Sequence, residues 1–168
     1  MAPDFEFKDY TVKVIGEMQD ALLRGLETAA GEIESITIRN SRQGHKYGDK
    51  EARSLWGHKV DEGAMTAQIG SQHEAGYWEE FGTGEHALHG DGRKGWWVYV
   101  EGEDSGDGGK SYATKEEAEE AAAFLRRVAK LDAYATNGLE PNRPLFRAFS
   151  SSKDTVQAIF QAELNGME

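Results

Sequence analysis

The sequence predicts an α+β fold in which helices near the two ends of the chain pack on a small antiparallel β-sheet. Apolar residues recur at helical spacing near both ends, and two alternating segments joined by a short turn lie between them. The 168 residues suffice for one domain with a real core. We therefore assign residues 1–168 to a single domain, with its core at about 5–84 and 140–165 and an inserted loop-strand-helix segment at about 85–140.

The first expected element is a long helix over about residues 7–33. Its apolar stripe consists of Val14, Met18, Leu22, Leu26, Ala29 and Ile33. Residues 35–39 then alternate, with Ile36 and Ile38 between polar neighbours, which predicts a short strand. Residues 40–50 have no apolar period and are expected to form a loop. Residues 55–60 and 64–69 flank Asp61-Glu62-Gly63, a pattern that predicts a β-hairpin with glycine at a positive-φ position.

A short helix is expected next, at about residues 72–81. Ser71 and Glu74 have the spacing of a capping box, in which each side chain satisfies a free amide of the first turn. Helical spacing places Tyr77 over Phe81, with Trp78 on their flank. We interpret this aromatic face as an amphipathic helix that plugs the core.

The same run ends in two acids and a Gly-Thr-Gly turn. Glu79 is expected to point away from the aromatic face, and Glu80 lies at its border. A carboxylate packed there needs donors, and the amides of the turn are the nearest candidates. Gly82 suits the left-handed position that ends a helix. Thr83 and Gly84 complete the turn, which we expect to set the direction in which residues 84–95 leave the core.

The segment at about 85–140 contains one strand-like run and one helix. Residues 96–100 are aromatic and β-branched, and the glycine-rich acidic stretch at 102–109 is expected to be a flexible tip. Thr114 and Glu117 form a second capping box, opening a helix to about residue 131 that we expect to pack on the rim of the domain. Asn137-Gly138 then turns the chain.

The last expected element is a helix that begins near Pro144. Asn142 is the expected cap, and Pro144 fits the first turn, where a missing amide has no cost. The helical period continues through Phe146, Phe149, Val156, Phe160 and Leu164.

The composition limits the classes of function. The net charge of -11 argues against general nucleic-acid binding, which needs an excess of Lys and Arg. The sequence has no cysteine, which excludes a disulfide framework, a thiolate nucleophile and a cysteine-based zinc site. The first residues lack the layout of a signal peptide, and no run approaches membrane-spanning length. A reducing cytoplasm is the expected compartment.

A local cluster of basic residues lies between Arg39 and Lys59. Six basic and two acidic residues give this stretch a charge of +4 within an acidic chain. We favour a solvated loop; the alternative is a surface that contacts DNA or an acidic partner. The residues that would make that contact are Arg42, Lys46, Lys50 and Arg53.

Enzymatic chemistry has little support in the sequence. Residues 90–95 match G-x-G-x-x-G by letters only, because no strand precedes them and no helix follows. No credible nucleophile–base pair is present, and no cofactor is expected. A metal-dependent hydrolase remains an alternative, although H-x-x-H in a loop is a weak metal signal. Its ligands would come from His86, His89, His73, Glu79, Glu80 and Asp91.

Two segments resemble the tail-component family of tailed bacteriophages. They are Tyr77-Trp78-Glu79-Glu80-Phe81-Gly82-Thr83-Gly84 and Arg143-Pro144-Leu145-Phe146-Arg147-Ala148-Phe149. Members carry an aromatic-aromatic-x-Glu-Phe-Gly-Thr run and later a Pro-Phe-Leu-type start to the last helix. The resemblance covers residues 5–84 and 140–165 in outline, including the order of helix, hairpin, turn and Pro-start helix. It departs before the hairpin, where members show Thr-Gly-x-Leu-Arg-x-Ser, and in the length of residues 85–140.

The resemblance implies a non-enzymatic structural protein of the virion. Such a protein joins head and tail, or completes the tail, as a ring of copies in the neck, expected to be a hexamer or a dodecamer. Its expected partners are itself, the head-connector protein and the tail-tube or tail-terminator protein. Genomic DNA would pass through the lumen without sequence-specific binding, and no membrane is involved. The expected location is the neck and tail of the virion, with host cytoplasm during assembly. A third alternative is an acidic intracellular protein that binds a basic partner.

Overall fold

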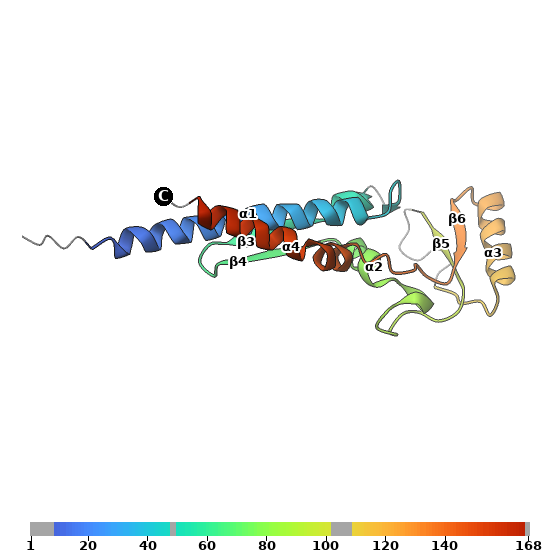
Figure 1. Cartoon of the computed structure of the whole chain (residues 1–168). Coiled ribbons are helices and arrows are strands. Elements are labelled where there is room, and N and C mark those ends of the chain that lie inside the picture. The colour runs from blue at the N-terminus through green and yellow to red at the C-terminus, as the bar shows by residue number, and fades with distance from the viewer. Residues whose placement is uncertain (1–8, 48–49, 102–108, 167–168) are drawn as a thin grey trace, which may run out of the picture.

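The computed structural model describes residues 9–47, 50–101 and 109–166 and has the predicted α+β architecture. The long N-terminal helix α1 (Thr11–Asn40) lies beside the C-terminal helix α4 (Pro144–Asn165), as Figure 1 shows. The strands form three separate two-stranded antiparallel sheets, β1-β2, β3-β4 and β5-β6, in place of one sheet. The molecule is elongated, and the unit of β5, β6 and α3 lies at the end opposite the start of α1 (Figure 1).

Helix α1 includes residues 35–39, so the strand predicted there is wrong. Thr37 is fully buried on the face that continues from Ile33, and its hydroxyl donates to the Ile33 carbonyl at 2.8 Å. Packing of this face outweighs the strand preference of the β-branched residues, which is a weak and context-dependent effect. The helix ends at Ser41, where the backbone becomes extended.

Helices α1 and α4 run antiparallel in close contact. Arg24 Nε lies 2.8 Å from Glu163 Oε2 near one end of the pair, and Asn40 Nδ2 lies 3.3 Å from the Pro144 carbonyl at the other. Small residues permit the approach; a Cβ on Gly25 would lie 2.7 Å from the Phe160 ring. The small buried residues of the two helices are Ala21, Gly25, Ala29, Ala30, Ala148 and Ser152.

The predicted hairpin is present with shifted bounds. Strands β3 (Gly57–Asp61) and β4 (Thr66–Gly70) pair from Gly57↔Gly70 to Asp61↔Thr66, and both contact α1. The turn covers four residues, and its positive φ falls on Met65 rather than on Gly63. Leu55, expected to begin the first strand, instead ends the 3₁₀ helix η1 (Ala52–Leu55). The predicted loop contains a short pair, β1 (Lys46–Tyr47) and β2 (Lys50–Glu51).

The inserted segment forms a unit with its own small core. Strand β5 (Trp97–Val100) was predicted, but its partner β6 (Ala133–Thr136) was missed. Helix α3 (Lys115–Val128) packs on both strands, and its cap is the predicted one: Glu117 N donates to Thr114 Oγ1 at 3.2 Å. The expected tip at 102–109 lies outside the described residues except for Gly109. The core of the unit consists of Val98, Val100, Ala122 and Ala133.

Candidate functional site

The site is built around helix α2 (Glu74–Phe81), which begins two residues later than expected. The capping box of Ser71 and Glu74 is wrong, because Ser71 Oγ accepts from His73 N at 3.0 Å within a local turn. His73 occupies the cap instead, and its Nδ1 accepts from Ala75 N at 3.1 Å. The predicted aromatic pair is confirmed, since the rings of Tyr77 and Phe81 lie 4.7 Å apart.

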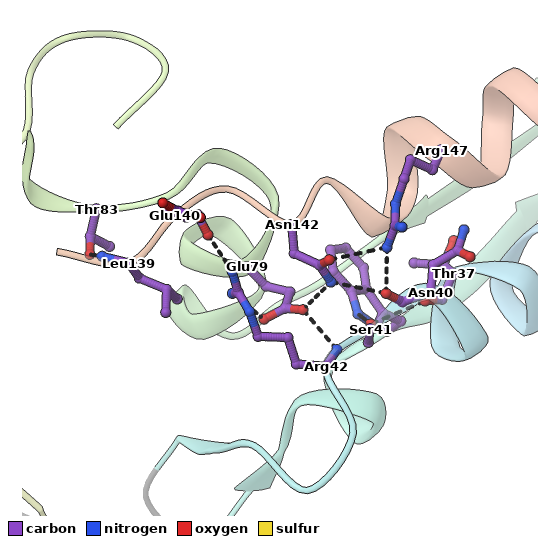
Figure 2. A network of polar contacts seen from close by, with 11 residues as sticks. Thr37, Asn40, Ser41, Arg42, Glu79, Thr83, Leu139, Glu140, Asn142 and Arg147 are labelled. Carbon is purple, nitrogen blue, oxygen red and sulfur yellow. Dashed lines mark hydrogen bonds and ion pairs between the residues drawn. The ribbon is translucent and has the colours of Figure 1, made fainter. Parts of the chain in front are cut away.

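Glu79, which was expected to point away from the aromatic face, is fully buried, so the side of α2 opposite the aromatic residues is the packed one. Its Oε1 accepts from the Arg42 backbone N at 3.0 Å and from Asn142 Nδ2 at 2.6 Å. Its Oε2 lies 3.1 Å from Arg42 Nη1. A buried carboxylate is stable only with such donors and a countercharge, and Arg42 supplies both (Figure 2).

The Glu79 network joins three elements that are far apart in the sequence. Asn142 Nδ2 also donates to the Asn40 carbonyl at 2.9 Å, and Arg147 Nη2 donates to the same carbonyl at 2.6 Å (Figure 2). Arg42 donates further to the Glu140 carbonyl. These bonds satisfy a carbonyl in the last turn of α1, which the helix itself leaves free. The network therefore locks the end of α1, helix α2 and the start of α4 together.

Glu80 is also buried, but its donors differ from those expected. Its carboxylate accepts from the backbone amides of Leu145 at 2.9 Å and Phe146 at 3.0 Å, in the first turn of α4, rather than from the Gly-Thr turn. The first amides of a helix are unsatisfied and carry partial positive charge, so a carboxylate stabilises them.

The expectation that Asn142 caps α4 is also wrong: Arg143, at φ 54°, is the N-cap residue, with Pro144 in the first turn as predicted.

The Gly-Thr-Gly turn holds the two ends of the inserted segment side by side. Gly82 has φ 75°, as expected, and a Cβ there would lie 2.7 Å from the Leu139 carbonyl oxygen. Thr83 N donates to Leu139 O at 2.9 Å, and Thr83 Oγ1 accepts from Leu139 N at 2.9 Å. Glu85 N donates to Asn137 O at 2.9 Å, beside Gly84 at φ 60°. The turn thus fixes where the segment leaves the core and where it returns.

Tyr77 and Phe81 line an open groove, and the aromatic face of α2 does not plug a core, which corrects the sequence interpretation. Tyr77 is 49% exposed and Trp78 38% exposed, while Phe81 is half-buried. The groove has a volume of about 580 Å³ and lies between α2, the start of α4 and Trp56. The Arg143 guanidinium lies 3.7 Å from the centre of the Phe146 ring. The apolar side chains that line the groove are Trp56, Tyr77, Phe81, Leu145, Phe146 and Phe149.

The four basic candidates do not form one free surface. Arg42 is held by Glu79, as described above. Lys46 lies in β1 and the exposed Lys50 in β2, where the pairs are Lys46↔Glu51 and Tyr47↔Lys50. Arg53 lies in η1, and its Nε is buried without a hydrogen-bond partner in the described part of the chain. Lys50 is therefore exposed and open to an acidic partner, whereas Arg42 is held by Glu79 and Arg53 is partly buried.

The histidines of the metal hypothesis have separate surroundings. His86 Nε2 lies 3.3 Å from Asn137 Oδ1, and the His89 ring lies 5.0 Å from the Phe81 ring. Within residues 9–47, 50–101 and 109–166, no three histidine or carboxylate side chains are grouped to hold a metal ion.

Sequence reasoning found the residues of the site but not all of their contacts. Tyr77, Phe81, Gly82, Pro144 and Phe146 were identified as parts of two motifs, and the structure brings both motifs to one groove. The roles of Glu79 and Asn142 were missed. The adjacent acids of α2 and the Asn-Arg before Pro144 were the available signals, because polar residues beside aromatic and proline positions need partners when they pack.

The chain was also compared with known proteins. Within the described residues, no helix combines the length and the apolar character that crossing a membrane requires. Searches against protein-family models, curated proteins and solved structures find no match for this chain.

Proposed function

We propose that this chain is a non-enzymatic assembly protein of a tailed-phage virion. In this proposal it forms a ring in the neck, between the head connector and the tail tube, and acts by protein–protein contact. The proposal rests on the resemblance of Tyr77–Gly84 and Arg143–Phe149 to the tail-component family.

One structural observation supports the proposal above the others. The two resembling segments, distant in the sequence, meet through Glu80 and the amides of Leu145 and Phe146. Together they build the aromatic groove, whose residues Tyr77, Phe146 and Phe149 are each about half exposed. Aromatic residues gathered on a concave surface are typical of protein-binding sites. A docking role therefore gives both segments a common purpose.

The charge and shape of the molecule agree with a ring component. A net charge of -11 suits a wall around passing DNA, because like charges keep the duplex from adhering. Exposed apolar residues occur on the first turns of α1 and on the unit of β5, β6 and α3. These two parts lie at opposite ends of the molecule (Figure 1). Contacts at the two ends suit a subunit with neighbours on either side.

Electron microscopy of the purified full-length protein tests the proposal. We expect annular particles with a central channel, and we expect these rings to bind one end of isolated phage tails. Particles that lack a channel and bind neither heads nor tails would refute the proposal that the protein is a ring component. Purification with a stoichiometric metal ion and a hydrolytic activity would favour the hydrolase alternative instead.

A further inference from the structure

We propose that the aromatic groove is the binding site for the N-terminal segment of a second copy of this chain. The segment is residues 4–18, and the side chains that would enter the groove are Phe5 and Phe7. This inference names the two surfaces that would build the ring proposed above. It depends on that proposal for its biological purpose, but not for its geometry.

The groove has a specific chemistry that an occupant must match. Its walls are aromatic, and its cation is Arg143, which stacks on Phe146. The Nε of Arg143 is buried and has no hydrogen-bond partner among the described residues. Two carboxylates also line the groove: Glu80, which the α4 amides occupy, and Glu74 in the first turn of α2. Near Arg143 the groove therefore favours a segment that combines aromatic rings with carboxylates.

The chain contains a segment of this kind immediately before α1. Residues 4–9 read Asp-Phe-Glu-Phe-Lys-Asp, in which two aromatics alternate with acids and the net charge is -2. The apolar character continues into the described residues. Five exposed apolar side chains occupy this start of the chain, namely Tyr10, Val12, Val14, Ile15 and Met18.

These turns of α1 also have room for a partner. The end of α4 contacts α1 at Arg24, through Glu163, so the first turns of α1 extend beyond α4 (Figure 1). Apolar residues on an uncovered helix face bury their surface only when another chain packs there. The chain therefore contains both an exposed apolar segment and an open aromatic groove that could receive it.

The segment cannot reach the groove of its own chain. The groove lies beside the C-terminal end of α1, since Asn40 contacts Pro144. A helix of 30 residues is about 45 Å long at a rise of 1.5 Å per residue. Even with the groove extending back along α4 to Phe149, more than about 30 Å separates it from the start of α1. The four residues from Asp9 back to Phe5 span at most about 14 Å when fully extended.

The contact is therefore between copies, and it is head-to-tail. One copy offers its segment and the next offers its groove, so each subunit uses two different surfaces. Repetition of such a heterologous contact closes into a ring if the rotation per subunit allows it, and otherwise continues as a filament. The acids of the segment would pair with Arg143 of the neighbouring copy, so association should weaken as salt rises.

A mixing experiment with full-length variants tests the inference. The segment variant is Phe5→Ser/Phe7→Ser, and the groove variant is Phe149→Glu on the exposed face of α4. Each variant lacks one half of the contact, so each should be monomeric alone by sedimentation velocity. The two mixed in equal amounts retain one intact contact and should form a 1:1 heterodimer that grows no further. The control is Leu88→Glu, an exposed apolar side chain outside the groove and outside both ends of the molecule, which should associate as the unaltered protein does.

Two further variants keep the test decisive. Tyr77→Ser alters the opposite wall of the groove and replaces Phe149→Glu if that variant melts early by circular dichroism. Arg143→Gln should weaken association several-fold and reduce its dependence on salt. The inference is overturned if the unaltered protein stays monomeric from micromolar to near-millimolar concentration, if the segment variant associates normally, or if the mixture stays monomeric. Rings that persist in the segment variant would overturn this contact and leave the proposed ring function standing.

Discussion

Glu80 Oε2 lies 2.9 Å from the backbone nitrogen of Leu145, so a carboxylate at the end of α2 caps the first turn of α4. The two motifs of the chain are joined by this bond and by its neighbour at Phe146. The geometry leads to four predictions about stability and one about location.

Glu80→Gln should lower the free energy of unfolding by about 1–2 kcal/mol, because an amide accepts through one oxygen where the carboxylate uses two. Urea denaturation of the full-length protein measures the change. The matched control is Glu120→Gln on the exposed side of α3, which should alter stability by less than about 0.5 kcal/mol. Equal stabilities for the two variants would show that the cap contributes nothing.

Arg42→Met should destabilise the chain by about 3 kcal/mol or more, since it leaves the buried Glu79 carboxylate without its countercharge. Arg39→Met provides the comparison, because Arg39 pairs with Glu32 at 3.4 Å on the surface and should contribute about 1 kcal/mol or less. Thermal melts of both variants reveal the difference. If Arg42→Met melts like Arg39→Met, the Glu79 network does not hold α1, α2 and α4 together.

Gly82→Ala should destabilise more than Gly44→Ala. Both glycines have positive φ, 75° and 67°, so both substitutions carry a backbone cost of about 1–2 kcal/mol. Only at Gly82 would the new Cβ meet a neighbour, the Leu139 carbonyl oxygen at 2.7 Å, whereas nothing lies within 4 Å at Gly44. The fall in denaturant midpoint should be larger for Gly82→Ala than for Gly44→Ala. This difference measures how closely the Leu139 carbonyl approaches Gly82. Identical midpoints would contradict that approach.

His58 should make stability depend on pH. Its hydrogen bond to the Glu34 carboxylate, aided by Glu27 at 3.2 Å, raises the His58 pKa above 6.5 against the opposing effect of burial. The folded state therefore favours the protonated ring. This stabilisation is complete below the unfolded pKa of about 6.5 and is lost as pH rises through the higher folded pKa.

The variant His58→Gln isolates the His58 effect. Between about pH 6 and about pH 9, the unaltered protein should lose more of its unfolding free energy than the variant does. Denaturation at matched salt measures both slopes. Parallel slopes would mean that His58 does not couple β3 to α1 through its charge.

The sequence predicted what depends on local spacing. The long helices, the Tyr77–Phe81 pair, the positive φ of Gly82 and the place of Pro144 follow from periodicity and from the chemistry of glycine and proline. These features were recoverable because each is set by neighbours within a few residues. Partners across the fold were not recoverable in this way.

Long-range contacts account for the errors. Ile36 and Ile38 alternate like a strand, but burial of Thr37 keeps them in α1. Helical spacing placed Glu79 opposite the aromatic face but could not predict its burial, because Arg42 and Asn142 come from other elements. The four residues of β6 are too few to show a period without knowledge of β5 beside them.

We propose that this chain is a ring component of the neck of a tailed phage. Immunogold electron microscopy tests this location most directly. The virions are those produced by the phage whose genome carries this gene. We predict that the gold particles lie at the junction of head and tail in intact virions, with little labelling of the rest of the head or tail. Label that stays in the soluble fraction of the lysate, with none on purified virions, would contradict the claim.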